Sequence, residues 1–140
     1  MNDRPIVFVP PADSRLGGGD IVISLTPEQS AALGPEADML ADWFHTMLWA
    51  LATLRTAEDG SVSRESWHAM INDLDNRLSP RLEGVKDAVV RAHADSGGSV
   101  GNLALAMDVP RSTAQYRREV LQRSAPSTWE TWAKSGGPQH

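Results

Sequence analysis

The chain has 140 residues, with 13 basic side chains, 18 acidic side chains, four histidines and no cysteine. This length suits one domain or two small units. The absence of cysteine excludes a disulfide framework, thiolate catalysis and a Cys-ligated zinc site. The longest apolar stretch, residues 47–54, is far shorter than the about 20 residues of a membrane-spanning helix. The first residues lack the basic start and apolar run of a secretion signal, so we expect a cytoplasmic protein.

The charge of the chain is unevenly distributed. Residues 1–80 carry 5 basic and 12 acidic side chains, whereas residues 81–123 carry seven basic and five acidic ones. Because an acidic surface repels nucleic acid, only the later segment is a credible nucleic-acid contact.

Residues 1–25 predict a pair of β-strands or a β-hairpin arm. The β-type runs 5–9 and 21–25 flank a polar, glycine-rich stretch that lacks the Gly-Lys-Ser/Thr of a phosphate loop. A lone two-stranded hairpin is marginal in water, so we expect it to pack on helices or on another chain.

Residues 26–78 predict a helical core and a dimerisation region. Thr26-Pro27-Glu28-Gln29 is typical of a helix start, and Gly34-Pro35 interrupts that helix. A helix is then expected over residues 35–57, because apolar residues recur there at helical spacing: Leu40, Trp43, Phe44, Met47, Leu48 and Leu51. We expect this helix to be the central core element. Its apolar stripe is wide, so part of it is also expected to join two copies of the chain in a homodimer.

The remaining helices are expected within 63–78, 80–94, 100–107 and 111–123, with Ser79-Pro80 starting a new helix. The predicted buried face of the helix over 80–94 consists of Leu82, Val85, Val89 and Ala92. Residues 124–140 predict a tail with one short helical turn, which a capping box of Ser127 and Glu130 would start. The end of that tail, 135–140, is expected to be disordered.

Residues 99–123 carry the most informative pattern in the chain. Ala104 is a small residue at the point where two helices would meet, and Asp108 and Val109 follow as a turn residue and an apolar plug. The next helix opens with Arg111-Ser112-Thr113. This pattern resembles the helix-turn-helix DNA-binding family over residues 80–123, about a third of the chain. It departs from the family pattern in two places: Asp108 replaces the favoured glycine, and Arg117 falls where an apolar residue would face the core.

The expected fold is therefore mainly α: a helical bundle with a trihelical helix-turn-helix module over 79–123 and a short N-terminal β-hairpin. Helical spacing that turns Ala114, Val120 and Leu121 inward turns the polar side chains of the last helix outward. Arg111, Ser112 and Gln115 lie in its first turns and suit base edges, whereas Tyr116 and Arg118 would more often touch phosphate. Arg117 is expected to be half-buried, with its guanidinium reaching outward.

These residues favour sequence-specific binding of double-stranded DNA, in a transcriptional regulator that acts as a homodimer through the 35–57 helix. Two other hypotheses stay open. The trihelical unit could instead dock a protein, which would make the chain a non-enzymatic interaction adaptor. The aromatic residues of the 35–57 helix could also line a pocket for an effector.

Other patterns carry little chemistry. Residues 59–65 resemble part of a calcium-binding loop, but three of the ligand positions hold unsuitable residues. The histidines lack metal-ligand spacing, and no nucleophile motif is present, so we expect no catalytic residue, no metal and no cofactor. Trp129 and Trp132 are expected to pin the tail on the last helix, with docking of a protein partner as the alternative.

Overall fold

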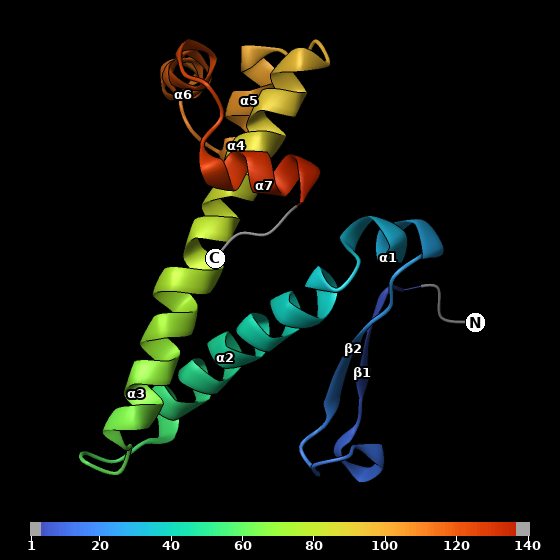
Figure 1. Ribbon diagram of the computed structural model, residues 1–140, viewed down its shortest axis with the longest axis vertical. Helices are drawn as coiled ribbons and strands as arrows, with labels where there is room; N and C mark the ends of the chain where they lie inside the picture. The colour runs from blue at the N-terminus through green and yellow to red at the C-terminus, as the bar shows by residue number, and fades with distance from the viewer. Residues whose placement is uncertain (1–3, 137–140) are drawn as a thin grey trace. The chain divides into compact units, whose positions relative to one another are not determined.

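The computed structural model describes residues 4–136 and divides into two compact units, Met1–Met39 and Leu40–His140. The fold is mainly helical with a two-stranded antiparallel sheet at the N-terminus, which confirms the expected class (Figure 1). The boundary between the units falls inside the predicted 26–78 region rather than at either of its ends. In the part of the chain that the structure describes, no helix is both long and apolar enough to cross a membrane.

The first unit contains the predicted hairpin. Strands β1 (Ile6–Val9) and β2 (Asp20–Ile23) pair antiparallel, with Ile6 opposite Ile23 and Val9 opposite Asp20. The 3-10 helix η1 (Pro11–Asp13) lies in their connection. Helix α1 (Pro27–Leu33) follows at the predicted helix start, and its first turn forms a capping box between Thr26 and Gln29. These elements therefore follow local sequence signals closely.

Helix α2 (Glu36–Thr56) begins and ends within one residue of the predicted bounds but is not the central core element. Only its Thr46 and Ala50 are buried, whereas Phe44, Met47, Leu48 and Leu51 are exposed. The small residues of α2, and not the large apolar ones, face the neighbouring helical segment. Thr46 Oγ1 donates a hydrogen bond of 2.7 Å to Asp73 Oδ2 of that segment. The expectation of a core helix is thus wrong for a single chain.

Helix α3 (Arg64–Ile71), the π-helical segment η2 (Asn72–Leu78) and helix α4 (Ser79–Asp95) follow one another without a break (Figure 1). The expectation that Ser79-Pro80 starts a separate helix is therefore wrong. Proline lacks an N–H and crowds the carbonyl four residues before it, which normally ends or kinks an α-helix. Here the Ser79 N–H bonds the Leu74 carbonyl five residues back, and this wider turn accommodates the proline.

The predicted buried face of α4 is also wrong. Its buried residues are Arg81, Gly84 and Val90, while Leu82, Val85, Val89 and Ala92 are exposed. The reason is that α4 serves two neighbours. Val90 faces the helices α5 (Val100–Met107) and α6 (Arg111–Arg123), and Gly84 faces α7 (Thr128–Ser135).

Helix α7 is longer than the predicted single turn and packs along α4 instead of the last helix of the trihelical unit. At Gly84 a Cβ atom would collide with the backbone of Trp129, so only glycine permits this close approach. Trp132 is buried in the same contact. Most of the tail predicted to be disordered, residues 137–140, lies outside the described residues.

Gly84→Ala should lower the free energy of unfolding by about 1–3 kcal/mol, because the added methyl group displaces the α7 backbone. Gly101→Ala is the matched control, since a Cβ there meets only Ser99 Oγ at 3.9 Å. Alanine has the higher helix propensity, so that variant should gain up to about 1 kcal/mol. Urea titration followed by tryptophan fluorescence measures both changes, and equal stability of the two variants would contradict the close contact between α4 and α7.

Candidate nucleic-acid interface

Helices α4, α5 and α6 meet around a small apolar cluster. Val90 of α4, Leu103 and Ala104 of α5 and Ala114 of α6 are buried together, and Ala114 has no exposed surface. Alanines at the contact of α5 with α6 let the two backbones approach closely, which is the role that the sequence predicts for Ala104. Partly buried apolar side chains complete the cluster: Val100, Met107, Val109 and Leu121.

The turn between α5 and α6 depends on a left-handed residue. Asp108 has φ 54° and ψ 52°, and it is the only residue other than glycine with positive φ in the described part of the chain. The Asp108 N–H bonds the Leu105 carbonyl at 3.2 Å, and the Val109 N–H bonds the Ala104 carbonyl at 3.1 Å. These two bonds form a Schellman C-cap, in which the apolar Val109 packs back on the cluster. Asp108 thus occupies the conformation that the family pattern assigns to glycine.

The N-terminus of α6 lies at the surface and has no side-chain cap. Its N-cap residue is Pro110, whose side chain cannot accept a hydrogen bond. Four other helices are capped by a side-chain hydroxyl group, which belongs to Thr26, Ser63, Ser99 or Ser127. The N–H groups of Arg111 and Ser112 therefore have no acceptor within their helix. The side chains of Arg111, Ser112 and Thr113 are exposed, and that of Arg111 makes no hydrogen bond or ion pair with another described residue. This end of α6 concentrates donors without acceptors.

The other predicted site residues on α6 differ in their exposure and in the hydrogen bonds that they make within the chain. Tyr116 is 65% exposed. Gln115 is exposed as well, and its Nε2 donates to Glu119 Oε1 at 3.0 Å. Arg118 is half-buried, because its Nη1 donates a 2.7 Å bond to the Gly98 carbonyl in the turn between α4 and α5. Arg118 therefore braces α6 against that turn, a role that its sequence position does not indicate.

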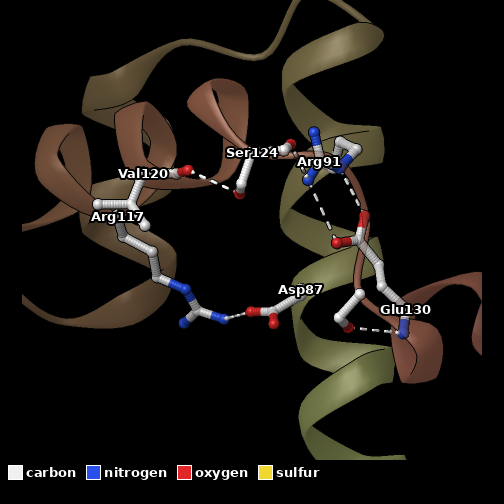
Figure 2. A network of polar contacts seen from close by, with 7 residues as sticks. Asp87, Arg91, Arg117, Val120, Ser124 and Glu130 are labelled. Carbon is white, nitrogen blue, oxygen red and sulfur yellow. Dashed lines mark hydrogen bonds and ion pairs between the residues drawn. The ribbon is translucent and has the colours of Figure 1, made fainter.

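Arg117 is half-buried, as the sequence predicts. Its Nη2 lies 3.2 Å from Asp87 Oδ1 of α4, so the guanidinium joins the two helices (Figure 2). Sequence reasoning missed this partner, since Asp87 lies 30 residues earlier in the chain. Near the other end of the helix, Arg123 lies 3.6 Å from Glu119 on the exposed surface. Of the four arginines of α6, Arg111 alone lacks a partner among residues 4–136.

Helix α7 supports α4 from another side through an ion pair between the half-buried Arg91 and the buried Glu130. Arg91 Nε lies 2.5 Å from Glu130 Oε2, and Arg91 Nη2 donates to Glu130 Oε1 and to the Ser124 carbonyl (Figure 2). The hydrogen bond that Arg91 donates to the Glu130 carboxylate raises the pKa of Arg91 above its ordinary value. Only half of the predicted capping box forms. Ser127 Oγ accepts the Glu130 N–H at 3.1 Å, whereas the Glu130 carboxylate binds Arg91.

A buried arginine, Arg81, joins three elements. The Arg81 guanidinium lies over the rings of Trp43, Trp129 and Trp132, at 4.4, 4.7 and 5.5 Å from their centroids. Its Nη1 also donates to the Arg77 carbonyl at 2.8 Å. Cation–π contacts of this kind hold α2 and α7 on α4. A protein partner at Trp129 and Trp132 would therefore compete with Arg81, which sequence reasoning did not single out.

No group of His, Asp or Glu side chains within residues 4–136 is arranged to hold a metal ion. Comparison of the chain with protein-family models, curated proteins and solved structures finds no match. The helix-turn-helix resemblance therefore rests on the residues and on the geometry described above.

Asp108→Gly should raise the free energy of unfolding by about 0.5–1 kcal/mol. Glycine adopts the left-handed conformation without the steric cost that any Cβ brings, and its greater freedom in the unfolded chain offsets part of this gain. Asp108→Val should be destabilising, because a β-branched side chain is strained at positive φ. Thermal unfolding followed by circular dichroism ranks the variants. A valine variant as stable as the wild type would show that the turn is not left-handed.

Proposed function

We propose that the chain binds double-stranded DNA in a sequence-specific manner and regulates transcription as a homodimer. The observation that carries this proposal is the exposed N-terminus of α6. A small three-helix core presents an uncapped helix end and an arginine without a partner in the described chain.

The residues at this end suit the major groove chemically. An arginine such as Arg111 can donate two bonds to guanine, a glutamine such as Gln115 pairs with adenine, and the Ser112 hydroxyl can bond either kind of base edge. The unpaired N–H groups and the positive end of the helix dipole attract a phosphate group. Donors to bases and to the backbone thus lie within two turns of one helix.

The charges limit how strongly one copy can bind. Arg117, Arg118 and Arg123 all have partners within the chain, so few cations are left to neutralise phosphate. The affinity of one copy should then be modest and only weakly dependent on salt. Two copies related by a two-fold axis double the contacts, and the DNA site should then be a pseudo-palindrome.

An adaptor that docks a protein through the trihelical unit is the alternative. The observation that favours it is that Arg117, Arg118 and Arg123 have partners within the chain and leave few cations for phosphate. Selection from a pool of random duplexes separates the two functions. The purified chain should enrich particular sequences, and its affinity for them should fall between about 50 and 200 mM salt. If no duplex is retained even at low salt, the adaptor function takes the place of DNA binding.

Arg111→Ala should reduce discrimination at one base-pair position by roughly 1–3 kcal/mol, because a bidentate contact to guanine would be lost. Arg123→Ala is a matched control at the other end of α6, where the guanidinium pairs with Glu119. It should weaken all duplexes slightly and alike. Fluorescence anisotropy with the selected duplex and its single-base variants measures both effects. Altered discrimination in Arg123→Ala but not in Arg111→Ala would place the base-reading end of the helix elsewhere.

A further inference from the structure

Helix α2 carries two faces with different surroundings. One face consists of Trp43, Thr46, Ala50 and Thr53, which are buried or half-buried. From this face Thr46 bonds Asp73, and Trp43 contacts Arg81 of α4. The other face carries five large apolar side chains at alternating spacings of four and three residues: Leu40, Phe44, Met47, Leu51 and Leu54. We call these five residues the outer seam of α2.

Leu40 is half-buried, and the other four residues of the outer seam are exposed in the single chain. Phe44 is 46% exposed, and Leu54 is 68% exposed. Leu48 flanks the seam and is 45% exposed. Between Leu40 and Leu54 the charged residue is Asp42, which the helical repeat places away from the seam. A continuous apolar patch of this kind on a soluble chain marks an interaction site.

The spacing of the seam specifies the shape of the partner. Alternation of four and three residues is the repeat of a coiled coil, in which the matching surface is another helix with the same repeat. A second copy of α2 provides that repeat with the same length. We propose that two copies of the chain pair through the outer seams of α2, antiparallel, about a two-fold axis near Met47.

The charges of α2 favour the antiparallel direction. Its first turn carries Glu36 and Asp38, and its last turn carries Arg55. An antiparallel pair places Asp38 beside Arg55 of the partner subunit, although Glu36 then lies opposite Glu58 of the partner subunit. A parallel pair brings both acidic first turns together and gains no such contact, so the side-chain charges favour the antiparallel direction by a small margin. The helix dipoles favour the same direction. In this register Leu40 lies opposite Leu54 of the partner subunit, and Met47 lies near its own copy.

The dimer proposed here is the homodimer of the proposed function. Its test contains no DNA, so a failure of this dimer can be distinguished from a failure of DNA binding. The chain has no cysteine, which allows single-cysteine variants to be oxidised without background. Met47→Cys should form covalent dimers with itself. Leu40→Cys and Leu54→Cys should form them only when mixed, because a disulfide needs Cα atoms within about 7 Å. Asp42→Cys is the control away from the seam and should form no covalent dimer.

A charge in the seam provides a second readout. Met47→Glu and Leu51→Glu should fold, because these side chains are already exposed in the single chain. Light scattering should give about twice 15.2 kDa for the wild type and 15.2 kDa for both variants, with unchanged helical circular dichroism. Ala52→Glu, an exposed substitution outside the seam, should remain dimeric.

Three results would overturn the proposal. One is a monomeric wild type at concentrations of hundreds of micromolar. Another is a dimer that persists in Met47→Glu and Leu51→Glu, which would place the interface elsewhere, for example on the N-terminal hairpin. The third is self-linking of Leu40→Cys and of Leu54→Cys, which would show a parallel pair.

Discussion

Helix α4 has to accommodate two neighbours at once, and the rest of the larger unit depends on how it does so. On one side Gly84 lets the α7 backbone come closer than any side chain would allow. The same side buries the charged groups of Arg81 and Glu130, which is tolerable only when each has a partner. The tryptophan rings around Arg81 and the guanidinium of Arg91 provide those partners. Loss of Arg91 would leave the Glu130 carboxylate buried without its cation, which is destabilising.

The other side of α4 determines where α6 lies. Val90 packs on Ala104 and Ala114, Asp87 pairs with Arg117, and the turn after α4 accepts a bond from Arg118. Each of these contacts uses the inner or lateral surface of α6. What remains outside is the uncapped first turn with Arg111, Ser112 and Thr113. Arg117 and Arg118, which orient the helix, are therefore unavailable for phosphate, and Arg111 stands at the end that our proposal assigns to bases.

The sequence predicts the local elements well because their signals are local. The hairpin strands, the capped start of α1, the bounds of α2, α5 and α6 and the left-handed Asp108 all follow from a few adjacent residues. The errors arise where apolar spacing was equated with burial. On α4 the apolar residues Leu82, Val85 and Val89 are exposed, while Arg81 and Gly84 are buried. This happens because the buried side of α4 packs on the backbone and the ring of Trp129. The contact between α4 and α7 spans about forty residues, and no short window of sequence contains it.

The most direct test of DNA binding by α6 is a titration of the ¹⁵N-labelled chain with a duplex obtained by selection, followed through the backbone amide shifts. The largest shifts should fall on Arg111, Ser112, Thr113 and Gln115, because their N–H groups lie at the proposed contact with phosphate and bases. Residues in the middle of α2 should change little, since the dimer is expected to exist before DNA is added. Shifts confined to α2 or α7, with the first turn of α6 unchanged, would contradict the account.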